Sequence, residues 1–189
     1  MSLKFSFGGV KALFALAALF LAGTAVQAQT SSGQLSITMT VQSSISLIFQ
    51  DNPSVGNAGF CPLTNAGTNN VGLDLGTAAF PGNFHTATCV NYQHLNAAFY
   101  QVSSAFDVVV KKLNSSSRNY RLAAEISTAP PNGVVWLMDN VTLSNTAFSQ
   151  LDAADTYDTP VTKTLHVQVR NNVPAQVLQE TINFLATAN

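Results

Sequence analysis

Charge is what this chain most lacks. Only 9% of its 189 residues are Asp, Glu, Lys or Arg, whereas an average soluble protein has about 25%. The one local concentration of basic residues is typical of a solvated strand face, and it consists of Lys111, Lys112, Arg118 and Arg121. We therefore expect no electrostatic footprint for nucleic acid, and no nucleic-acid partner.

Recognisable catalytic motifs are also missing. The sequence contains no Gly-x-Ser-x-Gly elbow, no His-Glu-x-x-His pair, no phosphate-binding loop and no glycine-rich fingerprint at the start of a helix. Its three histidines are His85, His94 and His166. The first two flank Cys89 in an order that superficially resembles a mixed nitrogen and sulfur metal site, but the spacing matches no copper or zinc pattern. We therefore expect a non-enzymatic protein with no catalytic residues, no cofactor and no bound metal.

Three carboxylates lie close together in a polar stretch: Asp152, Asp155 and Asp158. Oxygen ligands of this kind can chelate calcium in the loops of extracellular β domains. The spacing lacks the Asp-x-Asp-x-Asp-Gly order of a calcium loop. A solvated connection before the next strand is therefore the favoured interpretation, and calcium binding stays open as the alternative.

Long apolar runs are absent too, apart from the eleven residues from Ala12 to Ala22. A membrane-spanning helix needs about 20 such residues, so this run is too short for an anchor. It lies between Lys4, Lys11 and a small-residue cleavage site, Val26-Gln27-Ala28, as in a secretory signal. We predict that residues 1–28 are a cleaved signal peptide, that the mature chain has no membrane span, and that it is secreted, periplasmic or at the cell surface.

Cysteine is limited to Cys61 and Cys89. An even count in an exported chain favours a disulfide over two free thiols. Both cysteines lie within residues 50–98, a stretch rich in Gly, Asn, Thr, Pro and Ala in which only Val71–Gly76 reads as a short strand. A loop this long inside a domain is usually functional or separately pinned, so we predict a 50–98 loop that is pinned by a Cys61–Cys89 disulfide.

Alternation of apolar and polar residues is the dominant pattern that is present after the first thirty residues. It starts on odd positions at Leu35, Ile37, Met39, Val41, Ile45, Leu47 and Phe49. The same pattern predicts strands over 100–110, 120–126, 161–169 and 181–186, and a continuous apolar run after a Pro-Pro-Asn-Gly turn signal predicts one over 134–138. Sustained helical periodicity is lacking, and the best candidate for a helical turn is 146–154. The chain is therefore predicted to be all-β.

Strands with one apolar face need a second layer to cover it. Several short strands separated by turn signals therefore predict an antiparallel two-sheet sandwich formed by a single domain, residues 29–189, with a closed barrel as the alternative. Residues 114–119 are rich in turn formers, so the segments 100–110 and 120–126 are predicted to form a hairpin. Trp136, the only tryptophan, has apolar neighbours and is expected in the core.

The order of these elements resembles that of secreted bacterial fimbrial subunits and spore-coat-U-like surface proteins. The parts that carry the resemblance are an alternating stretch, a cysteine, a Val-x-Leu-x-Leu-Gly element and two further alternating segments, in this sequence Gly33–Val41, Cys61, Val71–Gly76, Phe106–Leu113 and Thr181–Asn189. The resemblance implies an immunoglobulin-like sandwich that serves in surface structure or adhesion, which is an inference from fold alone.

We accordingly expect a non-enzymatic, exported structural or adhesive surface protein, whose partners are other copies of itself or surface assembly proteins. A self-assembling, pilus-like subunit is the specific form of this hypothesis. The alternative is an extracellular carbohydrate- or ligand-binding sandwich that uses the 50–98 loop, with Phe80, Phe84 and Tyr92 as an aromatic surface.

The alternation from Leu35 to Phe49 is too long for one strand, because fully extended it would span roughly 50 Å at about 3.3 Å per residue. It divides at Ser43, which breaks the apolar pattern. Either both pieces fold into the same domain, as an edge strand and its continuation across a bulge, or the first piece is an assembly strand for a neighbouring subunit. The side chains that would enter the neighbour are Leu35, Ile37, Met39 and Val41. Because strands near in sequence usually pair with each other, folding within one domain is the favoured interpretation.

Overall fold

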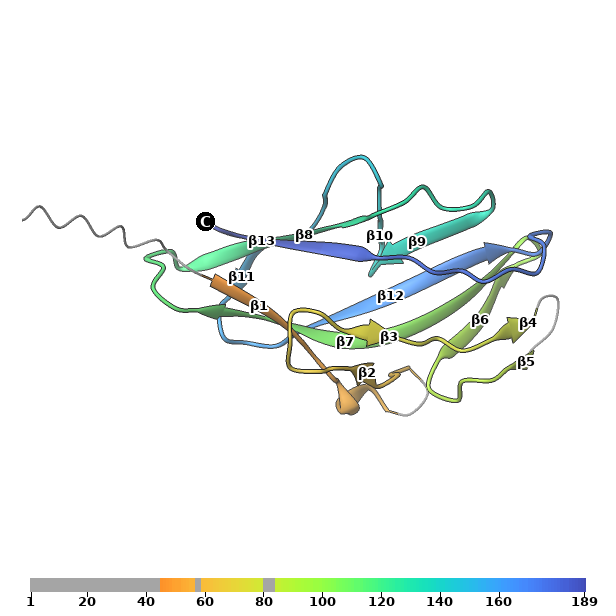
Figure 1. Cartoon of the computed structure of the whole chain (residues 1–189), viewed down its shortest axis with the longest axis horizontal. Helices are drawn as coiled ribbons and strands as arrows, with labels where there is room; N and C mark the ends of the chain where they lie inside the picture. Colours follow the sequence, from red (N-terminus) through yellow and green to blue (C-terminus); the bar gives the residue numbers. More distant parts are fainter. Residues whose placement is uncertain (1–44, 57–58, 80–83) are drawn as a thin grey trace, which may run out of the picture. The chain divides into compact units, whose positions relative to one another are not determined.

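The computed structural model describes residues 45–56, 59–79 and 84–189, and the regular structure of this part of the chain is almost entirely β (Figure 1). Among these residues the only helical element is a single 3₁₀ turn, η1 (Pro53–Val55). The prediction of an all-β fold is therefore confirmed.

The larger sheet has six antiparallel strands: β1 (Ile45–Gln50), β6 (Asn91–Asn96), β7 (Phe99–Lys112), β12 (Val161–Arg170), β9 (Val134–Met138) and β10 (Val141–Thr142). β7 is its longest strand and pairs with β12 along one edge. The other edge of β7 is shared, because β1 pairs with its C-terminal half and β6 with its N-terminal half. Both edges of β7 are therefore occupied.

The smaller sheet has three antiparallel strands in the order β11 (Ser149–Thr156), β8 (Asn119–Ile126) and β13 (Ile182–Ala188). Figure 1 shows β8 and β13 running above β7 and β12. β8 is the central strand, and its alternate side chains are fully buried: Tyr120, Leu122, Ala124 and Ile126. The alternation predicted from the sequence over 120–126 therefore marks the core-facing side of this sheet.

One hydrophobic core takes side chains from both sheets. The larger sheet contributes alternate residues of β7 and β12, which include Phe106, Val108, Leu165 and Val167. Trp136 on β9 belongs to the same core, as predicted. Two antiparallel sheets that share one core are the arrangement of a β-sandwich.

The predicted hairpin of 100–110 with 120–126 is wrong, because β7 lies in the larger sheet and β8 in the smaller one. β7 offers no free edge to β8, since β1, β6 and β12 already pair with it. Residues 113–118 instead cross between the two layers, which in sandwiches lie about 10 Å apart. The Ser117 hydroxyl helps to hold this crossing by its hydrogen bond to the Tyr157 hydroxyl (2.9 Å).

The helical turn considered for 146–154 is also wrong, because most of this segment is strand β11. The pairing of β11 with β8 shifts register between Gln150 and Asp152 and again between Asp152 and Asp155. A bulge inserts an extra residue on one strand and so changes which face the following side chains occupy. These irregularities explain why the sequence of β11 lacks clean alternation.

The 50–98 stretch contains more strand than predicted. It holds two small antiparallel pairs, β2 (Leu63–Thr64) with β3 (Gly72–Leu73) and β4 (Ala78–Ala79) with β5 (Phe84–His85). The strand predicted over Val71–Gly76 is reduced to β3. β6 was not predicted at all, because it is an edge strand whose side chains are nearly all exposed and polar, so it has no apolar alternation.

Candidate functional site

The smaller sheet ends in a strand with a free edge. β13 pairs with β8 on one side, and no other strand of the described ranges pairs with it. The N–H of Ser127 donates to the carbonyl of Thr181 (2.9 Å), and the N–H of Asn189 donates to the carbonyl of Asn119 (3.0 Å). Antiparallel pairing alternates, so the odd residues of β13 bond to β8 and the even residues direct their backbone groups to the open side. These even residues are Ile182, Phe184, Ala186 and Ala188.

β1 borders the same opening from the larger sheet. On the edge away from β7, the N–H of Phe49 donates to the carbonyl of Thr68 (2.8 Å), and the N–H of Gly67 donates to the carbonyl of Phe49 (2.6 Å). By the same alternation, the backbone groups of Ile45 and Leu47 point to this edge. The Phe49 and Phe184 rings meet edge to face with centroids 5.0 Å apart, so the two sheets touch here through side chains. We call the region bordered by β1, residues 71–78, β13 and residues 173–178 the open seam.

The open seam is lined by apolar side chains that are only partly buried. Six that pack against the core are Ile45, Leu47, Leu73, Val173, Ile182 and Phe184. Fully formed sandwiches bury such side chains under a further strand or layer. An apolar strip beside backbone groups that no described strand pairs is the kind of surface to which an extended segment can add.

The seam deepens into a cavity of about 660 Å³ between residues 74–78 and 173–178. The cavity is lined on its core side by Val102, Trp136, Val167 and Val169. Trp136 is only 7% exposed, and its indole N–H has no hydrogen-bond partner among the described residues. Leaving such a buried donor unpaired costs about 1–3 kcal/mol. The cavity is therefore suited to an apolar occupant that also brings a hydrogen-bond acceptor.

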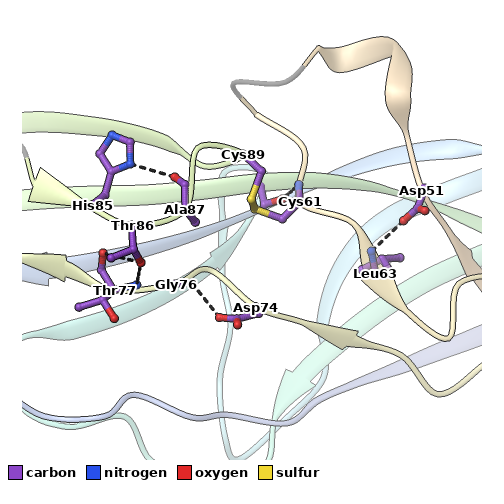
Figure 2. Close-up of a disulfide and its surroundings, with 11 residues drawn as sticks. Asp51, Cys61, Leu63, Asp74, Gly76, Thr77, His85, Thr86, Ala87 and Cys89 are labelled. Carbon is purple, nitrogen blue, oxygen red and sulfur yellow. Dashed lines mark hydrogen bonds between the residues drawn. A yellow bond between two sulfur atoms is a disulfide. The ribbon is translucent and has the colours of Figure 1, made fainter.

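One wall of the cavity is held by the predicted disulfide, which is confirmed (Figure 2). Cys61 and Cys89 lie at the two ends of the segment that contains residues 74–78, and the Cys61 N–H donates to the Ser104 hydroxyl on β7 (2.8 Å). Figure 2 shows the bonds that order the segment between them. Thr77 and Thr86 bond to each other through two 2.8 Å hydrogen bonds, one from each backbone N–H.

Gly76 is needed where this wall turns. Its φ is +69°, and the Asp74 carboxylate accepts a hydrogen bond from its N–H (2.8 Å). A Cβ at this position would lie 2.8 Å from the Cβ of Ala87 and 2.9 Å from the Thr86 hydroxyl oxygen. A positive φ and a close neighbour together favour glycine here.

The histidines near the disulfide do not form a metal site. Cys89 is bonded to Cys61, so its sulfur is not available as a ligand. The His85 ring stacks on Tyr92 with centroids 5.5 Å apart, and the His94 ring stacks on another tyrosine of the same sheet. Stacking against aromatic neighbours accounts for both rings.

The three aspartates considered for calcium binding do not meet at one point, because Asp152 and Asp155 lie near each other but Asp158 pairs elsewhere. Asp152 lies 2.7 Å from the Lys163 Nζ, and Asp158 pairs with Lys111 at 3.8 Å. Burial, and then the charge of Asp152, raise the pKa of Asp155. Among the described residues no group of three His, Cys, Asp or Glu side chains is arranged to hold a metal ion.

The third histidine lies on the outer face of β12 beside Ser103 of β7. The His166 Nδ1 is 2.8 Å from the Ser103 hydroxyl, and the two residues are direct cross-strand neighbours. Burial lowers the pKa of His166, and the nearby Asp139 charge offsets part of this effect. The pair is a cross-strand hydrogen bond within regular sheet, which favours a structural role over a catalytic one.

Several predicted elements lie outside the described residues. These are the signal peptide (1–28), the assembly-strand residues Leu35, Ile37, Met39 and Val41, and Phe80. Tyr92, which was considered for a flat aromatic surface, is partly buried beside His85 and Tyr100 instead of presenting an open face. No helix within the described ranges has the length and apolarity that a bilayer crossing requires.

No protein-family model, no curated protein and no solved structure matches this chain. The resemblance to fimbrial and spore-coat-U-like proteins therefore stays a prediction. The sequence analysis did not predict the open seam or the buried Lys163. The open seam could not be predicted, because it depends on which sheet each strand joins. Lys163 did have a sequence signal, because it is the one charged residue among the otherwise apolar odd positions of 161–169.

Proposed function

We propose that this protein is a non-enzymatic, exported structural or adhesive surface protein whose copies assemble by strand addition at the open seam. The observation that carries the proposal is the edge of β13 that no described strand occupies, where even residues present backbone groups without a strand partner among residues 45–56, 59–79 and 84–189, beside partly buried apolar side chains. An extended segment that bonds to this edge would satisfy the backbone groups and cover the apolar strip in one step. In this proposal the domain is an immunoglobulin-like sandwich that is completed by a strand from another copy.

The occupant that fits is the alternating segment before β1. Leu35, Ile37, Met39 and Val41 would all leave one face of a strand, as a row of pockets requires. Residues 29–44 could extend over roughly 50 Å at about 3.3 Å per residue, far enough to reach a second molecule.

The alternative is that the alternating segment pairs within its own molecule. That is the outcome which the experiment must separate from assembly.

A deletion tests the proposal. The mature chain is compared with a variant that lacks residues 30–41, by size-exclusion chromatography with light scattering and by electron microscopy. We expect the mature chain to form oligomers or filaments and the deletion variant to be a folded monomer. If the mature chain is monomeric and the deletion variant unfolds, the segment belongs to its own core and assembly by strand addition is wrong.

A synthetic peptide sharpens the test. A peptide of residues 30–41 added to the deletion variant should raise its melting temperature, because it binds the folded state only, and should change the fluorescence of Trp136 at the cavity. A peptide with Ile37→Ser and Met39→Ser should do neither. A peptide with Thr38→Ser, which changes the opposite face, is the matched control and should still bind.

The cavity supports a second candidate, an extracellular carbohydrate- or ligand-binding sandwich. Its volume of about 660 Å³ falls within the roughly 300–1,000 Å³ of small-molecule sites, and Trp136 offers both a ring and a free N–H. If soluble glycans change Trp136 fluorescence in the mature chain while the 30–41 peptide has no effect on the deletion variant, ligand binding is the better assignment.

A further inference from the structure

The cavity of the open seam has an apolar floor. Three of its floor residues form one row across adjacent strands, because Val167 on β12 lies opposite Val102 of β7 on one side and Trp136 of β9 on the other. All three side chains are buried. Adjacent strands lie about 4.8 Å apart, so this row offers a continuous apolar strip of about 10 Å. A strip of this length suits an extended alkyl chain.

The lining becomes polar toward the surface. Leu75 and Leu178 are partly buried and pack against the core, whereas Asp74, Thr77 and Gln176 line the same cavity and are exposed. An apolar interior with a few polar groups at one side is the usual composition of a small-molecule site. The matching occupant is an amphiphile, with its chain on the floor and its head group at the surface.

The charge at the surface end of the cavity is negative. Among the described residues that line the cavity, Asp74 is the only charged one. One of its carboxylate oxygens accepts a hydrogen bond from the Gly76 N–H (2.8 Å), as Figure 2 shows. Arg170, which lies close in sequence to the 173–178 wall, is directed to the Phe99 ring instead, 5.2 Å from its centroid. The cavity therefore favours a positively charged head group over a negatively charged one.

We propose that the cavity binds a long-chain amine, with its ammonium group at Asp74 and its alkyl chain along the row of Val102, Val167 and Trp136. The ammonium donates a hydrogen bond to the Asp74 carboxylate. A hydroxyl or carbonyl oxygen on the chain would also accept a hydrogen bond from the Trp136 indole N–H, which has no partner among the described residues.

Amine binding does not depend on the proposed assembly. Strand addition uses the edge of β13, whereas the amine uses the cavity between residues 74–78 and 173–178. Residues 29–44, the segment proposed for assembly, contain no Lys or Arg. Its side chains therefore cannot supply the cation that Asp74 favours.

Most of the affinity should come from the alkyl chain. Each methylene that leaves water should strengthen binding about fourfold. An ion pair at an exposed carboxylate contributes much less, so the charge of the head group should change the affinity by only about two- to fivefold. Chain length thus reports on the cavity floor, and head-group charge reports on Asp74.

The test is isothermal titration calorimetry of the mature chain at neutral pH and low ionic strength, with each ligand below its micelle concentration. Decylamine should bind about 15-fold more tightly than octylamine, which is shorter by two methylenes. It should bind about two- to fivefold more tightly than decanol, and decanoate should bind more weakly than decanol. Trp136 is the only tryptophan, so a change in its fluorescence on binding places the chain on the floor.

A charge variant tests the head group. Asp74→Asn keeps an oxygen that can accept the Gly76 N–H but removes the charge, so it should bind decylamine and decanol equally. Asp51→Asn is the matched control, because Asp51 also accepts a backbone N–H, from Leu63 (2.8 Å), and does not line the cavity. This control should keep the preference for decylamine.

A filled cavity tests the floor. Val167→Phe places a ring in the middle of the row and should weaken binding of decylamine at least about tenfold, which is the loss of about two methylene contacts. Val161→Phe adds the same ring to the same strand outside the cavity and should leave the affinity unchanged. If Val167→Phe does not fold, the chain-length series still tests the floor.

The proposal is overturned if the folded mature chain does not bind decylamine, or if it binds decylamine, decanol and decanoate equally. Binding of glycans at Trp136 without binding of decylamine also overturns it. Assembly is judged separately: filaments that bind no amine leave strand addition intact, and a monomer that binds decylamine leaves the amine site intact.

Discussion

Removal of the Cys61–Cys89 disulfide should destabilise the protein strongly, even though the disulfide closes only one region of the chain. Its two cysteines are separated by 28 positions, and the loop-closure model assigns a cross-link of this span about 3.5 kcal/mol, between the values for 15 and 100 residues. Replacing both with Ala, which adds no buried hydroxyl, should therefore lower the free energy of unfolding by about 3–4 kcal/mol. Urea denaturation followed by far-ultraviolet circular dichroism measures this change.

The stability that the cross-link contributes can be measured separately from the stability that the packing of the cysteine side chains contributes. Cys61 and Cys89 belong to a small cluster with Val90 and Val102, so the double variant also loses contacts there. Val90→Ala removes packing in the same cluster while the cross-link stays, and it should cost about 1–2 kcal/mol. Wild-type protein measured with a reductant loses the cross-link but keeps both cysteine side chains, so it should be more stable than the double Ala variant by the packing that Ala removes. A double variant within about 1 kcal/mol of wild type would refute the assignment of this stability to the cross-link.

Three further predictions test the seam, the wall and the outer face. Phe184→Ala should lower the free energy of unfolding by about 2 kcal/mol in urea titrations, less than for a fully buried Phe because the ring is only partly covered. Leu185→Ala, at its exposed neighbour, should change this free energy by less than about 0.5 kcal/mol. Equal effects would contradict the assignment of Phe184 to the core-facing side of β13 and Leu185 to the exposed side. Gly76→Ala combines a positive φ with a close contact to Ala87, so it should lower the free energy of unfolding by about 1 kcal/mol more than Gly67→Ala, where only the positive φ applies. Equal losses in urea titrations would mean that residues 74–78 can shift to accommodate the added Cβ at little cost. Burial lowers the pKa of His166 below its ordinary 6.5, so below pH 6.5 the unfolded chain takes up a proton there more readily than the folded chain does. The free energy of unfolding should therefore be highest above pH 6.5 and should fall as the pH drops below 6.5. His166→Gln should flatten this part of the profile of urea midpoints against pH, and an unchanged profile would exclude His166 as its source.

Strands whose apolar residues alternate could be predicted from the sequence, because the alternation reports one buried face regardless of neighbours. This holds for β1, β7, β8, β12 and β13, whereas β9 could be predicted from its continuous apolar run. β6 could not be predicted, since four of its six residues are polar, Tyr92 and Leu95 do not share one parity, and the edge of β7 makes it a strand. Alternation also does not reveal which sheet a strand joins, which is why β7 and β8 were expected to pair.

The site could be predicted only in part, for the same reason. The pairing of Cys61 with Cys89 follows from their number and the predicted export, without any knowledge of the fold. The open seam depends on the edges that pairing leaves free, so the partly buried row that includes Ile182 and Phe184 looks in the sequence like any half-buried strand. Lys163 did leave a local signal, but its meaning depends on Asp139 and Asp152, which different loops and strands bring to it.

The shared edge of β7 has a consequence for the order in which the chain folds. β6 reaches β7 through the two residues 97–98, whereas 56 residues separate the end of β1 from its partner Asp107. Loop-closure entropy rises by about 0.6 kcal/mol for each doubling of length, so docking β1 costs about 3 kcal/mol more than closing the β6–β7 hairpin. An oxidised Cys61–Cys89 pair bypasses about half of that long connection and removes about one doubling. The hairpin should therefore form early and β1 late, and oxidation of the cysteines during export should speed the docking of β1 about threefold.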